Sequence, residues 1–240
     1  QRVRAHPFRE TGGGRVALIG GPGGNSELWV AELERGVVSK LTRAESVSNP
    51  VWTPDGSRIA YRIRASGAQN RRERIAWRTA DGSRDPETLY ESGEQAVPSG
   101  FTPDGRRLLF SELKANTLVS DVFVLPLAGA RTPEVLLAGD AGERDAVISP
   151  DGRFVAYGSN ESGGMNIFVR PFPSGEGRWQ ISSDLGFEPR WSPDMKELYF
   201  RRAAAIVRVP IETRGGFRAG RPEIAVDRTS AAGGIHTYSI

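Results

Sequence analysis

A four-residue motif recurs along the chain at nearly even spacing, and it constrains the fold more than any other feature of the sequence. The motif is Ser or Thr, then Pro and Asp, with Gly at the fourth position in three copies and Met in the last copy. The prolines of successive copies lie 49, 47 and 43 residues apart. Self-similarity at this period is typical of a chain that repeats one supersecondary unit. The four copies occupy residues 53–56, 102–105, 149–152 and 192–195.

Each copy of the motif predicts a corner between two β-strands. The hydroxyl residue begins a type I turn, proline sets φ at the second position, and Gly follows Asp. Apolar and polar residues alternate on both sides of the motif, as in residues 58–63 and 196–201. This alternation has the period of a half-buried strand. The motif therefore predicts a hairpin corner rather than a reactive site.

Alignment of the copies predicts four strands in each repeat. A strand ending in a bulky residue precedes each corner, and these residues are Trp52, Phe101, Ile148 and Trp191. The three strands that follow each corner are predicted at residues 59–63, 75–78 and 87–90; 108–110, 121–127 and 134–137; 154–157, 166–171 and 179–182; and 198–200, 206–211 and 223–226. Four strands in about 45 residues form one blade of a β-propeller. The predicted fold class is all-β, with blades of four antiparallel strands.

The start of the chain contains a weaker copy of the same unit, so five repeats are visible. In it, residues 11–15 replace the motif, and strands are predicted at 16–19, 27–33 and 38–42. The repeats span residues 1–45, 46–94, 95–142, 143–185 and 186–234, and we expect residues 1–240 to form one propeller domain. Residues 235–240 are predicted as a strand that either closes the ring against the first blade or begins a further blade of a six-bladed ring. The second alternative is favoured because the strand ends where another corner would begin.

The repeat resembles that of the TolB-like bacterial β-propellers, in which an aromatic residue precedes the corner and an Ile-Ala-Phe-like strand follows it. Residues 170–182, which contain Pro-Phe-Pro and Trp-Gln-Ile-Ser, together with residues 188–194, also resemble the C-terminal propellers of some bacterial serine/threonine protein kinases. Met195 stands where Gly is usual, and Gly12-Gly13 stands where Pro-Asp is usual. At these two corners the sequence therefore predicts a less tight turn, while the predicted fold is unchanged. The resemblance implies a bacterial, periplasmic or otherwise extracytoplasmic protein, although the residues themselves leave a cytoplasmic location open.

Composition excludes several classes of function. The 240 residues contain no cysteine, which excludes disulfides and thiol chemistry, and no apolar stretch approaches the length of a membrane span. The net charge is only +3. One basic cluster, formed by Arg71, Arg72 and Arg74, is a candidate basic loop for an anionic partner, against the alternative of a solvated loop tip. Nucleic acid is disfavoured as a partner because no aromatic residues alternate with this cluster.

No catalytic, metal-binding or cofactor-binding motif is present. The only histidines are His6 and His236, and neither has the spacing of a metal site or of an activated nucleophile. The chain lacks a Gly-x-Ser-x-Gly elbow, a phosphate-binding loop and the kinase signatures. The four motif aspartates would lie at equivalent points of separate blades, too far apart to coordinate one ion. We therefore expect no enzymatic activity, no metal and no cofactor in this chain.

The candidate binding residues are those predicted to enter the innermost strands, which line the central channel of a propeller. The residues five positions before each motif proline, together with the arginines beside the two acids among them, are Asn49, Pro98, Arg144, Asp145, Glu188 and Arg190. A polar channel mouth of this kind can accept a peptide, a loop or an ion. The alternative is that these charges only pair locally and are solvated.

Two classes of function fit these observations. The first is a non-catalytic propeller that binds a protein or peptide as the scaffold or sensor module of a larger bacterial protein, with the C-terminal region of a serine/threonine kinase favoured. The alternative is the accessory propeller of a prolyl-oligopeptidase-type serine peptidase, or a stand-alone periplasmic TolB-like binding protein. The sequence does not fix the oligomeric state.

Overall fold

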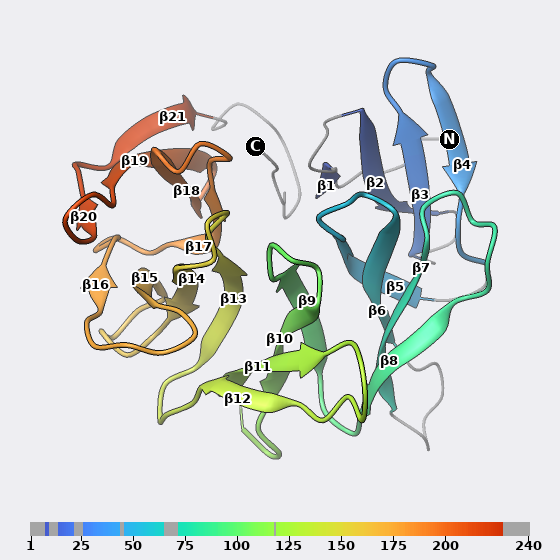
Figure 1. The fold of residues 1–240 in the computed structure, drawn as a ribbon, viewed down its shortest axis with the longest axis horizontal. Coiled ribbons are helices and arrows are strands. Elements are labelled where there is room, and N and C mark those ends of the chain that lie inside the picture. Colours follow the sequence, from blue (N-terminus) through green and yellow to red (C-terminus); the bar gives the residue numbers. More distant parts are fainter. Residues whose placement is uncertain are drawn as a thin grey trace.

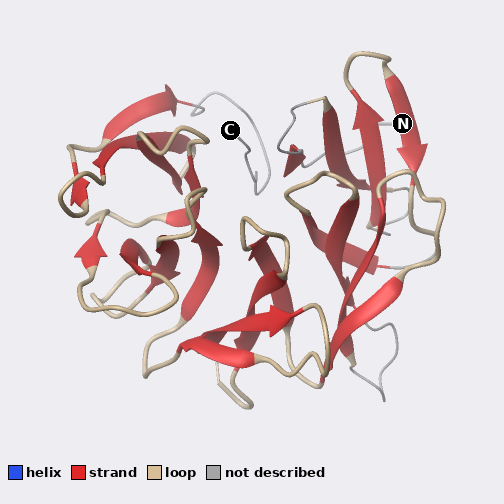
Figure 2. Cartoon of the chain, viewed as in Figure 1, coloured by secondary structure: helices blue, strands red, loops and turns tan. Residues whose placement is uncertain are grey.

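Five small antiparallel sheets surround a central axis in the computed structural model (Figure 1). The structure describes residues 8–9, 14–21, 26–43, 46–64, 72–117 and 119–227. All regular structure in these residues is β-strand (Figure 2). The described residues therefore form a β-propeller of five blades, one for each repeat visible in the sequence; the favoured alternative of a further blade depends on residues 235–240, which lie outside the described residues.

Each repeat contributes one blade, and the strands follow in chain order outward from the axis. The first two blades contain β1 (Phe8–Arg9), β2 (Arg15–Gly20), β3 (Glu27–Glu32) and β4 (Val37–Lys40), then β5 (Ser46–Trp52), β6 (Arg58–Arg64), β7 (Glu73–Thr79) and β8 (Glu87–Ser92). The next two contain β9 (Ala96–Phe101), β10 (Arg107–Leu113), β11 (Ser120–Pro126) and β12 (Glu134–Leu137), then β13 (Glu143–Ile148), β14 (Phe154–Ser159), β15 (Asn166–Pro171) and β16 (Trp179–Gln180). The fifth contains β17 (Phe187–Trp191), β18 (Glu197–Arg202), β19 (Ala205–Glu212), β20 (Arg218–Ala219) and β21 (Glu223–Asp227).

The fifth blade differs from the predicted pattern by one strand. Both β20 and β21 pair with β19, so a short additional strand lies beside the expected fourth one. The sequence gives no alternation at Arg218–Ala219 because the strand has only two residues. The predicted strand at residues 235–240 lies outside the described residues.

The corner motif forms the same hydrogen-bonded turn in all four copies. In the first copy the Gly56 N–H donates to the carbonyl of Thr53 over 2.9 Å, and the Asp55 carboxylate accepts from the Thr53 hydroxyl over 2.6 Å and the Ser57 N–H over 3.0 Å. Equivalent hydroxyl-to-carboxylate bonds, of 2.6 to 2.8 Å, are made by Asp104, Asp151 and Asp194. The prediction that these aspartates stabilise the corners is confirmed.

The corner that lacks glycine keeps the same backbone conformation. Met195 has a φ of 62°, close to the 66° of Gly56, and its N–H donates to the Ser192 carbonyl over 3.1 Å. A left-handed backbone costs an L-residue about 1–2 kcal/mol. The Met195 side chain packs against the apolar cluster between the fourth and fifth blades, which offsets part of this cost. The other departure, Gly12-Gly13, lies outside the described residues.

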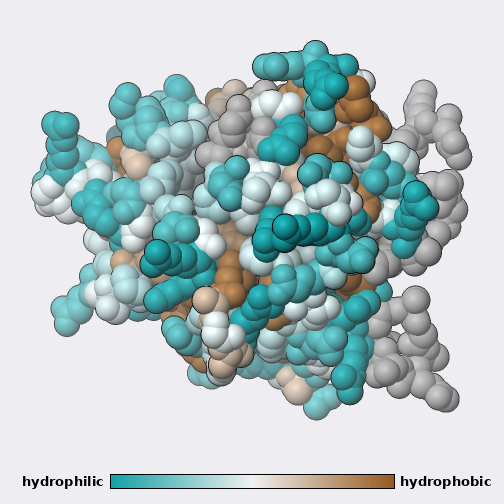
Figure 3. Space-filling view, turned by 45° about the vertical axis from the view of Figure 1, so that its right-hand side comes forward, coloured by the Kyte–Doolittle hydropathy of each residue, from teal (hydrophilic) through white to brown (hydrophobic). Residues whose placement is uncertain are grey.

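The core is divided among the interfaces between neighbouring blades. Trp52 and Trp191 lie at equivalent positions and are each 8% exposed, which confirms that they pack between blades. At the first interface, Arg15 stacks on Trp52 at 5.2 Å and donates to the Gly56 carbonyl over 2.8 Å. Charged side chains cover the outward faces of the strands, and the face shown in Figure 3 is largely hydrophilic. Each blade therefore depends on its neighbour for its apolar contacts.

The corner carboxylates predict a specific sensitivity to acid. Hydrogen bonds from Thr53, Thr102 and Ser192 lower the pKa of Asp55, Asp104 and Asp194 below the ordinary value of 3.8. Burial opposes the lowered pKa of Asp151, and bonds from Ser149 and Arg153 outweigh it. A lowered folded-state pKa means that this stability is present above pH 3.8 and is lost as the pH falls through the folded-state values.

Changing all four corner aspartates to asparagine should lower the thermal unfolding midpoint at neutral pH by several degrees and flatten its dependence on pH in the acid range. Circular dichroism melts between neutral and acid pH measure both effects. Asp140→Asn, in the exposed loop after β12, is the matched control and should leave the acid dependence unchanged. The same acid dependence in the fourfold variant and the parent protein would contradict this assignment.

Candidate functional site: the axial channel

Four of the five innermost strands, β5, β9, β13 and β17, contain a β-bulge near the middle. The register with the second strand of the blade shifts between Ser48 and Val51, between Arg144 and Val147, and between Phe187 and Arg190. In β9 the shift lies at Ser99. A bulge places one extra residue opposite its partner strand and increases the local twist. The strands therefore bend at the level where they approach the axis most closely.

The bulge residues include three of the polar residues predicted to ring the channel. Asn49, Asp145 and Glu188 have φ values of 52°, 57° and 55°. This left-handed conformation is uncommon for residues other than glycine, and it is retained where the surrounding structure holds it in place. Pro98 occupies the equivalent position in β9 and cannot adopt a positive φ, because its ring fixes φ near −65°. The bulge in β9 still falls at the equivalent place, because Pro98 and Ser99 lie between the paired residues Val97 and Gly100 and only Pro98 is paired, with Phe110.

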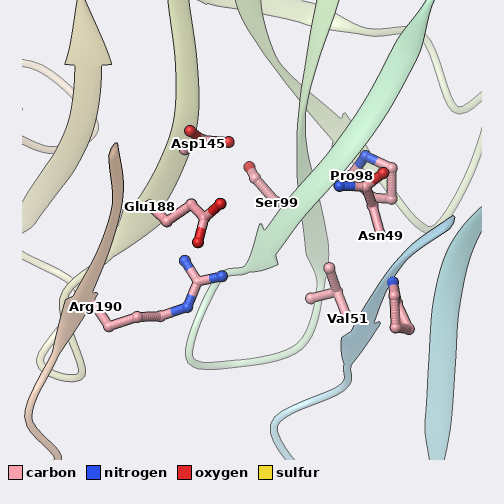
Figure 4. Close-up of a pocket in the computed structure, with 8 residues that line it drawn as sticks. Asn49, Val51, Pro98, Ser99, Asp145, Glu188 and Arg190 are labelled. Carbon is pink, nitrogen blue, oxygen red and sulfur yellow. The ribbon is translucent and has the colours of Figure 1, made fainter. Parts of the chain in front are cut away.

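Inside the ring of bulges lies a small cavity of about 40 Å³. Figure 4 shows the side chains of Ser99, Asp145, Glu188 and Arg190 converging on this space. The residues that line it are Asn49, Pro50, Val51, Pro98, Ser99, Asp145, Glu188 and Arg190. A polar cavity of this size holds a few water molecules at most.

A larger cavity of about 600 Å³ lies on the other side of the bulges. Four blades contribute to its wall: Asn49, Gln95, Val97, Ser111, Leu113, Ser120, Arg144, Asp145, Phe187, Glu188 and Arg201. Asn49, Asp145 and Glu188 line both cavities and so separate them. We call the larger space the mouth cavity. Its volume falls in the range of ligand-binding pockets.

Opposite charges meet at the bottom of the mouth cavity. Arg201 forms an ion pair with Glu188, with 3.3 Å between the guanidinium nitrogen and Oε1. Burial raises the pKa of Asp145, and the charge of Glu188 raises it further, whereas Arg190, Arg144 and a hydrogen bond from the Glu188 N–H oppose the rise. The two acids are thus bonded within the channel wall.

The structure brings together all six residues predicted at the channel mouth, and Pro98 lines the small cavity. Asn49, Asp145 and Glu188 lie at the bulges, Arg144 faces the mouth cavity, and Arg190 faces the small cavity. That they bind a partner stays a prediction.

The sequence analysis missed Arg201, which contributes to the mouth cavity from the second strand. Arg201 pairs in register with Phe187, and the equivalent residue of the second blade is Arg62, which pairs with Ser48. Alignment of the second strands would have shown an arginine at this position in both blades. It could not have separated their roles, because Arg62 is 7% exposed and forms an ion pair with Glu73 at 2.5 Å, away from the mouth cavity.

The candidate basic loop is only partly described. Arg71 lies outside the described residues. Arg72 is exposed and lies 3.5 Å from the Glu91 carboxylate, and Arg74 is half-buried on β7. An interaction of this loop with an anionic partner stays a prediction.

A second large cavity, of about 540 Å³, lies among the corners of the second and third blades. Its wall includes Asp55, Asp104 and Trp77, and the Arg58 guanidinium stacks on the Trp77 ring at 4.2 Å. The carboxylates here already accept the corner hydrogen bonds, and the Trp77 indole N–H donates to Glu87 over 2.8 Å. Its polar groups serve the fold, so the mouth cavity is the better candidate site.

The described part of the chain contains neither a metal-binding cluster nor a membrane-spanning helix. No group of three or more His, Cys, Asp or Glu side chains there has the arrangement needed to hold a metal ion. In the same residues, no helix has the length and apolar character of a membrane span.

No protein-family model and no curated protein matches the sequence. Solved structures do match. A protein assigned as TolB from Agrobacterium tumefaciens is 18% identical with a TM-score of 0.70, over 94% of this chain and 83% of that one. TolB from Acinetobacter baumannii is 17% identical with a TM-score of 0.71, over 91% of this chain and 54% of that one.

The chain therefore shares the β-propeller fold of these two TolB structures. A prolyl endopeptidase structure is 17% identical with a TM-score of 0.62, and the match covers 91% of this chain but only 35% of the enzyme. Identities this low establish a shared fold, so the activity of this propeller has to be argued from its own site.

A buried acid beside the mouth cavity gives this propeller a second pH dependence. Glu143 precedes Arg144 on β13, is 7% exposed, and accepts a bond from the Ser120 hydroxyl through its carbonyl over 2.8 Å. Burial raises the pKa of its carboxyl from 4.5 to about 7, and the charges of Asp121 and Glu161 add to the rise. A raised folded-state pKa means that stability is present below 4.5 and is lost as the pH rises through 7.

Glu143→Gln should therefore be more stable than the parent protein at pH values above 7, by at most about 3 kcal/mol, and should gain little in acid. Gln keeps the size of the side chain and removes the buried charge. Urea unfolding on both sides of neutrality measures the difference, with Glu134→Gln on exposed β12 as the control. An equal loss of stability at high pH in parent and Glu143→Gln proteins would contradict the prediction.

Proposed function

We propose that this TolB-like propeller is a non-catalytic binding module that recognises a protein or peptide at its mouth cavity. The observation that carries the proposal is the convergence of side chains from four blades on one cavity of about 600 Å³. Polar groups at its bottom and apolar side chains such as Val97, Leu113 and Phe187 on its wall fit a peptide segment better than a small inorganic ion. The similarity to TolB structures supports a binding role.

We further infer that the propeller acts as the scaffold or sensor module of a larger bacterial protein outside the cytoplasm. The Pro-Phe-Pro and Trp-Gln-Ile-Ser segment favours the C-terminal region of a serine/threonine kinase. The prolyl endopeptidase match supports the alternative of an accessory propeller in a peptidase. The complete gene distinguishes these cases: an upstream kinase domain followed by a membrane span supports the first, and a flanking Gly-x-Ser-x-Gly hydrolase domain supports the second.

A substitution that fills the mouth cavity tests whether peptides bind there. Peptides selected by phage display on the immobilised chain should bind Val97→Trp at least about tenfold more weakly, because the larger ring occupies the mouth cavity. Val135→Trp places the same ring on exposed β12 and should bind like the parent protein. Fluorescence anisotropy with labelled peptides gives the affinities. Equal binding to both variants, or a selection that yields no binding peptide, would refute the proposed site.

The absence of catalysis is tested directly. The purified chain should hydrolyse neither ATP nor a chromogenic prolyl peptide faster than a heat-denatured sample does, because no activated nucleophile is recognisable in its sequence. Turnover that copurifies with the folded chain and is lost on substitution of a channel residue would show that the propeller itself is an enzyme.

A further inference from the structure

The mouth cavity contains two arginines from adjacent blades whose hydrogen-bonding capacity is only partly used within the described residues. Arg144 comes from β13 and Arg201 from β18, and both line the cavity. The Nε atom of each is buried and has no hydrogen-bond partner within the described residues. A buried charged donor without a partner costs free energy that a ligand can recover.

Arg201 is held in place by two contacts, and its buried Nε has no hydrogen-bond partner within the described residues. Its guanidinium carbon lies 5.1 Å from the centre of the Phe187 ring, and one terminal nitrogen lies 3.3 Å from Glu188 Oε1. The stacking and the ion pair fix the plane of the group. Because an arginine presents five donors in a rigid fork, the remaining donors keep a defined direction.

Arg144 has fewer partners still. The side chain passes over Gly158, where an added Cβ would lie 3.6 Å from Arg144 Cγ, so the glycine leaves room for the arginine stem. No hydrogen bond and no ion pair within 4.0 Å joins the Arg144 side chain to another residue in the described part of the chain. Its guanidinium therefore lines the mouth cavity without a hydrogen-bonded counterion among the described residues, although its charge acts on the neighbouring Asp145.

We propose that Arg144 and Arg201 together bind a carboxylate group of the partner at the bottom of the mouth cavity. This rests on the proposed function of that cavity and names the chemical group it recognises. Among the described residues that line the two cavities, the charged groups are the guanidiniums of Arg144, Arg190 and Arg201 and the carboxylates of Asp145 and Glu188, an excess of one positive charge. A monoanionic carboxylate balances that excess. Arginine side chains commonly bind a carboxylate through two parallel N–H···O hydrogen bonds.

Other ligand charges fit this site less well. A cation would have to displace bonds that the acids already make, since Glu188 pairs with Arg201 and Asp145 accepts the Glu188 N–H. A phosphate dianion would bring a second negative charge next to both acids. The carboxylate has two sources in a polypeptide, an Asp or Glu side chain and the C-terminus, and the experiment separates them.

The first test uses a small probe and does not depend on finding a partner. N-acetyl-glutamate N-methylamide should shift the arginine Nε–H resonances of Arg144 and Arg201 in NMR spectra of the whole chain, and the matched glutamine compound should not. Arg144→Gln or Arg201→Gln should weaken binding of the probe by about tenfold, the scale of a charge-assisted hydrogen bond. Arg107→Gln, exposed beside a corner, is the control. Equal shifts with both compounds, or tighter binding of inorganic phosphate, would overturn the assignment.

The second test uses the peptides selected on the chain and separates this inference from the proposed function. Replacing one acidic residue by its amide, or amidating the C-terminus, should weaken binding about tenfold in the parent protein and leave Arg144→Gln and Arg201→Gln unaffected. The position of that change identifies the source of the carboxylate. Peptides that Val97→Trp excludes but that tolerate every neutralisation would overturn this inference and keep the proposed function. Failure of all peptides to bind at the mouth would overturn both.

Loss of folding is distinguished from loss of the site by conservative variants. Arg144→Lys and Arg201→Lys keep the charge and remove the two-donor edge, so they should melt like the parent protein and bind the glutamate probe with intermediate affinity. A lysine variant that melts normally and binds the probe as tightly as the parent protein would show that the arginine geometry is not used.

Discussion

The crowding of four innermost strands around one axis is the constraint on which the channel depends. Each of these strands ends at a corner whose Asp carboxylate and Ser or Thr hydroxyl tie the turn together. Because the corner fixes the end of the strand, the bulge falls at a fixed distance before it, and two bulge residues lie opposite a single residue of the second strand: Tyr61, Phe110, Tyr157 or Phe200. These four aromatic side chains are buried. The polar bulge residues Asn49, Asp145 and Glu188 line the axial cavities.

The two acids at the bulges, Asp145 and Glu188, find their bonding partners in the channel wall itself. The Asp145 carboxylate accepts a hydrogen bond from the backbone N–H of Glu188 in the next blade. The Glu188 carboxylate forms an ion pair with Arg201 on the neighbouring strand. The ring is connected in other ways too, since the Ser99 hydroxyl donates to the Ala146 carbonyl over 2.7 Å. These bonds hold the channel wall together, and the donors left over face the mouth cavity.

The repeat predicted the fold in detail because its signals are local. Strand periodicity and corner chemistry are properties of a few adjacent residues, and they located the second, third and fourth strands of four blades closely. The same repeat located Asn49, Asp145 and Glu188 by counting back from the corner proline. Arg201 was missed because its place in the cavity depends on pairing with Phe187 in another strand. The division into two cavities depends on the bulges, which no local pattern of residue types specifies.

Residues that differ between equivalent positions of the blades separate side chains needed for packing from side chains that could contact a partner. The residue that opens the second strand after the corner is Arg15, Arg58, Arg107, Phe154 or Glu197 in the five blades. Three of these pack on an aromatic ring: Arg15 stacks on Trp52 of the next blade, Arg58 stacks on Trp77 of its own blade, and Phe154 lies 5.3 Å from Phe217 of the next blade. Such variation is explained by contacts within the propeller. Arg201 also stacks on an aromatic ring, that of Phe187, but Arg201 and Arg144 each keep a buried Nε atom without a hydrogen-bond partner in the described residues. Their positions vary between blades, and their Nε donors make no hydrogen bond to the described residues. We therefore infer that packing of the fold alone does not require these side chains.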